Sequence, residues 1–530
     1  MSDLIQKEFK GWRLNLWPVH RHEYKKIIPM GIIMFATIFI YTIVRDTKDT
    51  LIVNAAGAGT LTFLKSYFVA PCAILFIISY SYLAHYLTRE KLFYVTITPF
   101  LIFFGLFGFV FYPCINYLHP SPDTVKALYI MAPSLSGFID IYAYWMYSLF
   151  YIFAEIWGSA IIAVCFWQFA NFIIHISDSK RFYGLFAVVG NMSLIFSGPV
   201  VMFCSQTIKD YVPNDVDPWG VSLKLLMGLV VLMGITAVYC FRWLHTNVLH
   251  EKHYDHYTKY NQKNNDSGLK KKSPGLLDSF KIVLKSKELM LILILILSYN
   301  ITINIVEIQW KNQLKLFTLG DRGLYNSIMG CSSFVQGCFS IVFGLFIGNQ
   351  ILRKFSWYTA AIITPIILLV GGSIFFSFLL NETLVMAFFH SLTTSPTLIA
   401  TLIGFIVVSI SKPTKYMLFD PTKEMAYIPL SPEEKIKGKV AADVMGARVG
   451  KGSGAMIQSW LLMLFVTKDV VLIAPFSLVL FLGIIVAWFY SVKVLSLKVD
   501  KNTACAIERE SITETVITSS SGTKAQENVA

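Results

Sequence analysis

Several charged side chains of this chain lie inside long apolar runs, and these residues are the most able to do chemistry. Glu155 lies within YWMYSLFYIFAEIWGSAIIAV (144–164), and Arg448 and Lys451 lie within GARVGKGSGA (446–455). A charge within an apolar helix is costly and usually marks a substrate pathway or a buried pair. These residues therefore predict a route for a polar or charged substrate.

A second cluster follows the first apolar run of the chain. It contains Arg45, Asp46, Lys48 and Asp49, and Tyr41, Arg45 and Lys48 share one helix face. An aromatic ring beside two cations suits a base attached to phosphates. The alternative is a set of ordinary interfacial charges that reach the lipid headgroups.

Two more groups complete the candidate residues. Glu307 and Lys311 are one helical turn apart, which predicts either a simple ion pair within the helix or a buried pair that opens during transport. Tyr151 and Ser148 share a helix face with Glu155. We expect these hydroxyl groups to hydrogen-bond the substrate.

The glycine-rich segment around Lys451 resembles a phosphate-binding P-loop only superficially. Gly446 and Gly450 are separated by three residues instead of four, and Gly452 follows Lys451 where Ser or Thr is required. We therefore reject nucleotide hydrolysis here and expect a cationic contact for an anion, with a lysine that reaches the membrane surface as the alternative. The sequence also lacks hydrolase motifs and clustered Cys and His ligands, so we predict neither an enzyme nor a cofactor or metal site.

The composition shows which elements must position these residues. The 530 residues are 55% hydrophobic and only 15% charged, and the mean hydropathy is +0.59. About twelve apolar runs are long enough to cross a lipid bilayer as helices. We expect an all-helical membrane protein with helices near 27–44, 62–86, 92–113, 138–165, 183–206, 221–243, 288–310, 325–350, 357–380, 384–411, 438–466 and 470–494.

Basic residues predict how the helices are oriented in the membrane. The N-terminus and every second loop carry the larger share of Lys and Arg, which places both termini in the cytoplasm. This distribution explains the net charge of +13 without a nucleic-acid partner. The segment KYMLFDPTKEMAYIPL (415–430) then reads as a cytoplasmic loop, which we expect to be a structural clamp or gate.

The helices divide into two groups of six around a long polar segment. We expect a cytoplasmic N-terminus, an N-terminal half, a cytoplasmic linker, a C-terminal half and a disordered cytoplasmic tail, at 1–26, 27–243, 244–287, 288–495 and 496–530. Weak similarity relates the halves, because IVRDTK (43–48) aligns with IVEIQW (305–310) and sets Arg45 opposite Glu307. Such repeats are typical of carriers with a site between the halves.

Specific motifs go beyond a generic carrier. The chain resembles the ATP/ADP translocases of obligate intracellular bacteria and plastids from about Trp17 to Lys498. The motifs that carry the resemblance are RDTKDTLIV (45–53), AEIWGS (154–159), FWQFAN (166–171), KRFYGLF (180–186), LFDPTKEMAYIPL (418–430) and GKGSGAMIQS (450–459). A departure is VNAAGAGTLTF (53–63), where many members carry a Pro-Gly-Ser-Gly-Ala-Glu-like stretch.

The resemblance implies a major-facilitator-like exchanger in the bacterial inner membrane that imports ATP in return for ADP and phosphate. It also implies that four charged positions serve transport, namely Lys48, Glu155, Glu307 and Lys451. We expect the partners to be nucleotides, phosphate and the lipid bilayer, with the monomer as the functional unit. The alternatives are a transporter of other or several nucleotides, a nucleotide-proton symporter, and a receptor that binds nucleotide without moving it.

Overall fold

The computed structural model describes residues 19–174, 176–213, 215–248, 283–381 and 395–427, residues 383, 387 and 430, and residues 439–498. In this part of the chain all regular structure is helical. Eleven of the described helices are long and apolar enough to cross a membrane, and α23 (Lys439–Leu464) is a further long helix. The predicted multi-pass helical fold is confirmed.

The N-terminal half contains six long helical segments, several of which include a π-helical stretch. Its elements are α3 (Tyr24–Ala56), α4 (Thr60–Phe63), η2 (Leu64–Val69), α5 (Ala70–Tyr86), α6 (Arg89–Leu106), η3 (Phe107–Phe111), α10 (Trp145–Trp157), η5 (Gly158–Phe166), α11 (Trp167–Ile173), α12 (Ile176–Ser205) and α13 (Pro218–Asn247). Between α6 and α10 the chain forms the short helices α7 (Ile115–Leu118), α8 (Pro122–Met131) and α9 (Ser136–Ala143).

The C-terminal half repeats this arrangement. Its elements are α16 (Lys287–Phe317), α17 (Arg322–Val342), η7 (Phe343–Gly348), α18 (Asn349–Lys354), α19 (Trp357–Leu380), α21 (Pro396–Thr414), η8 (Lys415–Phe419), α22 (Asp420–Ala426) and α23. A last helix spans Ala474–Lys498.

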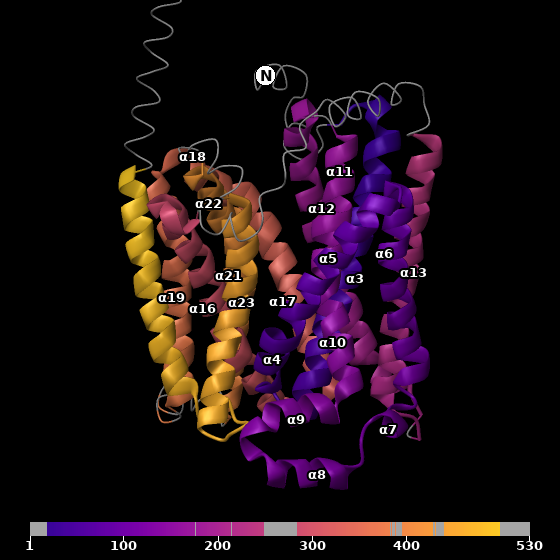
Figure 1. The fold of residues 1–530 in the computed structure, drawn as a ribbon, viewed down its shortest axis with the longest axis vertical. Helices are drawn as coiled ribbons and strands as arrows, with labels where there is room; N and C mark the ends of the chain where they lie inside the picture. Colours follow the sequence, from indigo (N-terminus) through magenta and orange to yellow (C-terminus); the bar gives the residue numbers. More distant parts are fainter. Residues whose placement is uncertain are drawn as a thin grey trace, which may run out of the picture.

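The two halves stand side by side and meet mainly through α12 and α17. In Figure 1 their ribbons converge at the end where α4 and α9 lie and separate toward the opposite end. We call the first of these the α9 end. One pair of facing glycines explains why α12 and α17 can approach so closely. A Cβ on Gly198 would lie 2.6 Å from the carbonyl oxygen of Gly330, and one on Gly330 would lie 2.8 Å from that of Gly198.

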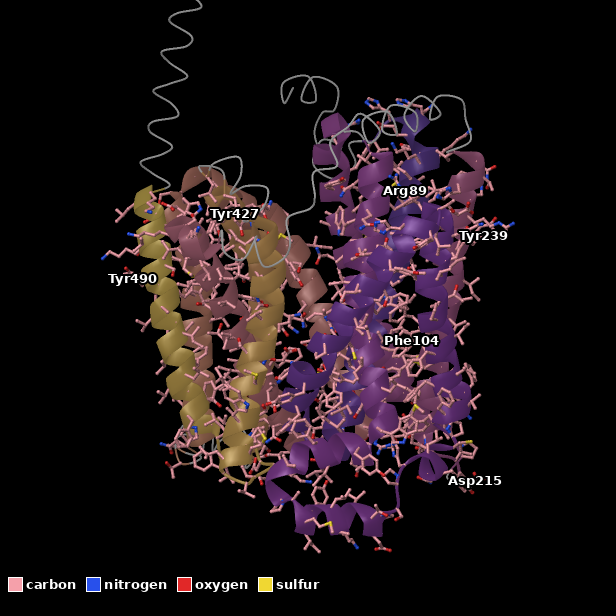
Figure 2. All side chains as sticks on the ribbon, in the orientation of Figure 1. Arg89, Phe104, Asp215, Tyr239, Tyr427 and Tyr490 are labelled. Carbon is pink, nitrogen blue, oxygen red and sulfur yellow. The ribbon has the colours of Figure 1, made fainter. Side chains whose placement is uncertain are left out.

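The outer surface of the bundle suits a hydrocarbon solvent. Tyr239 and Tyr490 project outward from the two halves and are 67% and 65% exposed, whereas Phe104 is buried within the N-terminal half (Figure 2). Exposed apolar side chains also cover α5, for example Leu75 and Ile78 at 64% and 61%. A soluble monomer rarely exposes such contiguous apolar surface, so this surface faces lipid.

Several predicted boundaries were wrong, and two of them lie at charged segments. The first helix was predicted over 27–44, but α3 continues to Ala56 and carries Arg45 and Lys48 inside it. The predicted loop 415–430 begins instead as helix, because η8 and α22 continue α21 as far as Ala426. Helical hydrogen bonding keeps polar backbone groups satisfied inside the membrane, and Pro421 lies in the first turn of α22, where a proline is tolerated. The helix predicted over 138–165 is also interrupted at Tyr144 and continues to Ile173.

The predicted N-terminal segment, linker and tail lie mostly outside the described residues. The predicted clamp role of segment 415–430 has a structural counterpart within the described part. Lys423 lies 2.9 Å from Asp443 of α23, and the Tyr427 hydroxyl donates a hydrogen bond to the same carboxylate at 3.1 Å. These contacts tie α22 to α23.

Candidate functional site

The charged residues of α3 lie at the centre of the molecule and not at a membrane surface. Lys48 and Asp49 are each only 2% exposed. Lys48 Nζ lies 2.8 Å from Asp49 Oδ1 and 2.9 Å from Glu155 Oε1 of α10. The interpretation of these groups as ordinary interfacial charges is therefore wrong, because α3 continues beyond them and neighbouring helices cover them.

The same network crosses from one half of the protein to the other. Lys311 Nζ on α16 lies 2.8 Å from Asp49 Oδ2 and 3.2 Å from Glu307 Oε1. Glu307 in turn pairs with Lys412 of α21 at 3.1 Å. The predicted ion pair within the helix is confirmed, and the pair also belongs to a buried network. Whether it opens during transport stays a prediction. We define the central network as Glu155, Lys48, Asp49, Lys311, Glu307 and Lys412.

Arg45 forms a second cluster directly beside the central network. Its guanidinium lies 5.7 Å from the centre of the Tyr41 ring, as expected for residues on one helix face. It pairs with Asp46 at 3.1 Å and donates a hydrogen bond to Ser333 Oγ of α17 at 2.7 Å. Ser333 also donates to Asp46 Oδ2, so this cluster likewise joins the two halves.

Tyr151 is fully buried against the network. Lys48 Nζ lies 3.8 Å from the centre of its ring, and no partner of its hydroxyl occurs among the described residues. Ser148, by contrast, donates to the carbonyl oxygen of Ile141. Tyr151 is thus a free hydrogen-bond donor beside the cations, whereas Ser148 already has a partner within the protein.

Lys451 differs from the other cations. It lies in the middle of α23, its side chain is exposed, and no carboxylate pairs with it within the described part of the chain. Glu155 lies within its electrostatic range, so Lys451 borders the network. Arg448 lies in the same helix, but its side chain lies outside what the structure describes.

Sequence reasoning missed three residues of this region. Lys412, Lys65 and Asn304 belong to it, and Lys65 Nζ donates a hydrogen bond to Asn304 Oδ1 at 2.7 Å. Lys65 and Lys412 lay at the edges of predicted helices, where a lysine is unremarkable. The signal that could have revealed Lys412 is the polar segment after it, which forms further helix and so places Lys412 inside the membrane.

Contacts between the halves close the α9 end. Lys468, which follows α23, lies 3.0 Å from Asp140 of α9, and Lys209 lies 2.9 Å from Asp321. Burial raises the pKa of the Asp140 carboxyl above its usual range. In the described part of the chain, the hydrogen bonds and ion pairs between the halves lie at the central network or toward this end.

This arrangement can bind and release an anion. Four of its cations are held by carboxylates of the protein, so an entering phosphate can replace those carboxylates as their partner. No cluster of His, Cys, Asp and Glu able to hold a metal ion occurs within the described ranges.

A family model decides where this chain belongs. The model of the TLC ATP/ADP transporter family matches residues 2–499. The chain belongs to this family. This membership agrees with the two helical halves and the buried charges between them. It also agrees with the predicted class of membrane transporter.

Relatives within the family cover nearly the whole chain. ADP,ATP carrier protein 1 of Chlamydia pneumoniae is 40% identical over 495 residues, which cover 93% of this chain and 94% of that protein. ADP,ATP carrier protein 1 of Rickettsia conorii is 35% identical over 483 residues, covering 91% and 94%. The chloroplastic ADP,ATP carrier protein 2 of Arabidopsis thaliana is 38% identical over 475 residues, covering 89% and 74%.

Solved structures support the fold alone. A bacterial homologue of the iron transporter ferroportin in an inward-facing state superposes with a TM-score of 0.54 at 11% sequence identity, covering 91% of this chain and 99% of that one. The two chains therefore share their helix arrangement.

Proposed function

We propose that this protein exchanges ATP for ADP across a membrane by alternating access, with the central network as its binding site. The observation that carries the proposal is the bridge between Asp49 and Lys311, which links buried charges of both halves in a member of the TLC ATP/ADP transporter family. The relatives are named ADP,ATP carrier proteins, which supports these nucleotides over others.

The pairing of the cations accounts for exchange instead of one-way transport. Glu155 and Asp49 hold Lys48, and Glu307 holds Lys311 and Lys412. A nucleotide presents several anionic oxygens that compete with these carboxylates. These ion pairs tie α3, α10, α16 and α21 together, so without nucleotide the protein changes slowly between its two orientations. A bound nucleotide breaks the ion pairs and allows the change.

The excess of positive charge favours an anionic substrate. The region contains Arg45, Lys48, Lys65, Lys311, Lys412 and Lys451, and the carboxylates within it are those of Asp46, Asp49, Glu155 and Glu307. Six cations against four carboxylates leave a charge of +2 among these described residues. Lys48, Arg45 and Lys451 are the cations that we assign to the phosphates, with Tyr41 near the base.

We infer that the α9 end faces the outside and that both termini face the cytoplasm of a bacterium, in its inner membrane. The distribution of basic residues supports this orientation. With this orientation, the contacts at the α9 end close the outer side of the protein. We further propose that the monomer is the functional unit, that phosphate accompanies ADP, and that the nucleotide gradients, without hydrolysis, drive the exchange.

Proteoliposomes provide the test. Vesicles loaded with ADP should take up labelled ATP at least about tenfold faster than empty vesicles, a rate ratio that corresponds to a barrier difference of about 1.4 kcal/mol. Equal rates in loaded and empty vesicles would exclude exchange. Uptake into empty vesicles that requires an imposed pH gradient would instead indicate nucleotide-proton symport, and no uptake under any condition would favour a receptor.

A further inference from the structure

Lys65 is a lysine inside the protein that lacks a carboxylate partner. It lies in η2, at the level of the central network, and is only partly exposed. Its one hydrogen-bond partner among the described residues is the uncharged side chain of Asn304 in the other half. An ammonium group that loses part of its water without gaining a counter-charge is destabilised. The three lysines of the central network, in contrast, pair with Asp or Glu.

Asn304 is incompletely bonded as well. Because an ammonium group can only donate hydrogen bonds, the amide oxygen of Asn304 must face Lys65, and this turns Nδ2 away from it. Asn304 is only 3% exposed, and its Nδ2 has no partner among the described residues. Buried donors without an acceptor are uncommon in folded proteins. This one therefore points to an acceptor that arrives with a ligand.

The surroundings of Lys65 identify the kind of acceptor. Lys311 and Lys48 lie within electrostatic range of Lys65 and repel it, while Glu307 and Glu155 attract it. Both carboxylates already pair with other lysines. Two further donors, the hydroxyls of Tyr151 and Tyr325, are fully buried near the same charges and also lack partners in the described part.

We propose that Lys65 Nζ and Asn304 Nδ2 form a phosphoryl-binding subsite between the two halves. A phosphoryl group would supply the missing negative charge to Lys65 and the missing acceptor to Asn304. The π-helical stretch η2 supports this role, since π-helical turns are frequent at functional sites. The subsite rests on the proposed nucleotide exchange and adds contacts from η2 and α16 to the central network.

The geometry distinguishes this subsite from a structural tie between the halves. If the hydrogen bond between Lys65 and Asn304 only held the halves together, replacing the amide by a carboxylate of the same shape would preserve or strengthen it. If the pair binds phosphoryl oxygens, the same replacement neutralises Lys65 and repels the substrate. Asn304→Asp therefore separates the two roles.

The experiment compares reconstituted wild-type protein with Asn304→Asp, Lys65→Gln and Lys65→Arg. We expect Asn304→Asp and Lys65→Gln to raise the KM for labelled ATP and ADP by about tenfold or more, and Lys65→Arg to retain most of the affinity. The melting temperature of Asn304→Asp should equal or exceed that of the wild type. Lys224→Gln is the matched control, because Lys224 is an exposed lysine of membrane-spanning α13.

Different results identify different failures. A wild-type KM for ATP, ADP and phosphate in both Asn304→Asp and Lys65→Gln would overturn the subsite while leaving exchange intact. If the wild type itself exchanged no nucleotide, the proposed function would fail. The subsite would then be tested by ligand binding instead of transport. In that case ATP or inorganic phosphate should raise the melting temperature of the wild type but not of Asn304→Asp, and an equal rise in both would overturn the subsite.

Parallel uptake of labelled phosphate identifies the source of the phosphoryl group. A raised KM for both nucleotides and phosphate indicates that they share the subsite. A raised KM for phosphate alone assigns the subsite to free phosphate and still supports it.

Discussion

Asp49 and Lys311 occupy equivalent positions in the two halves, and they pair with each other at 2.8 Å. Extending the alignment of IVRDTK (43–48) with IVEIQW (305–310) by one residue sets Asp49 opposite Lys311, just as Arg45 lies opposite Glu307. The charges at both positions are inverted between the halves. Because equivalent positions of the two halves carry opposite charges, residues of one half can pair with residues of the other. This explains how a buried network forms at the interface.

The inversion extends to the fourth and tenth membrane helices. Glu155 lies three residues before η5 begins at Gly158, and Lys412 lies three residues before η8 begins at Lys415. The two π-helical stretches thus follow opposite charges at corresponding places. The ion pairs of Glu155 with Lys48, Asp49 with Lys311 and Glu307 with Lys412 join α3, α10, α16 and α21 around one centre.

The bridge between Asp49 and Lys311 predicts strong energetic coupling. Asp49→Asn should destabilise the protein by about 2–4 kcal/mol, because it leaves the buried charge of Lys311 with fewer partners. The double variant with Lys311→Gln should lose less stability than the sum of the two single variants. Thermal unfolding in detergent measures this. Additive losses would contradict a direct interaction.

Lys451 and Lys48 should respond differently to neutralisation. Lys451→Gln should reduce ATP uptake by about tenfold or more and leave the melting temperature unchanged, since no carboxylate in the described part depends on Lys451. Lys48→Gln should reduce both, because it frees Asp49 and Glu155 from their common partner. Full uptake by Lys451→Gln would remove Lys451 from the phosphate site.

Glu155 and Glu307 should affect turnover more than binding. If their carboxylates hold the cations only in the empty protein, Glu155→Gln and Glu307→Gln should bind ATP at least as tightly as the wild type. The exchange rate should nevertheless fall by about tenfold or more, because release then becomes slow. Binding by calorimetry and counter-exchange in vesicles separate these effects. Weaker ATP binding in both variants would argue for direct contact with the substrate.

The close approach of α12 and α17 predicts a steric requirement for glycine. Gly330→Ala places a methyl group 2.8 Å from the carbonyl oxygen of Gly198, so closure of the α9 end should be impaired and uptake reduced by about tenfold. Gly228→Ala on α13 is the control, because its new methyl group would lie 3.7 Å from Phe109. Equal uptake by both variants would show that this contact is not needed in the transport cycle.

His119 predicts part of the response to acid. Burial and the nearby Arg322 lower the pKa of His119 to about 4, below the ordinary value of about 6.5. Between these values the unfolded chain binds more protons than the folded one, so stability falls as the pH decreases from about 6.5 toward about 4.

Melting temperatures at pH 7 and pH 5 test this response. His119→Gln should show a smaller acid-induced decrease than the wild type, by about 1–3 °C. His85→Gln is the control, since His85 is exposed on α5. An identical decrease in the wild type and His119→Gln would assign the acid response to other groups.

The sequence by itself determined the membrane fold, the division into two halves and most of the charged residues at the centre. Apolar runs of this length have few alternatives to spanning helices, because lipid cannot satisfy an open backbone. Charges within such runs are visible for the same reason, which is why Glu155, Glu307 and Lys451 could be singled out.

Only the tertiary structure decided which charges meet and which remain free. A prediction from hydropathy ends a helix at its first cluster of charges, so Arg45 and Lys48 resembled interfacial residues. In the structure α3 continues past them to Ala56. Partners such as Asp49 and Lys311 are far apart in sequence, and their distance depends on how the halves pack. Lys65 shows the same limit, because its lack of a counter-charge is a property of its surroundings and not of its place in the chain.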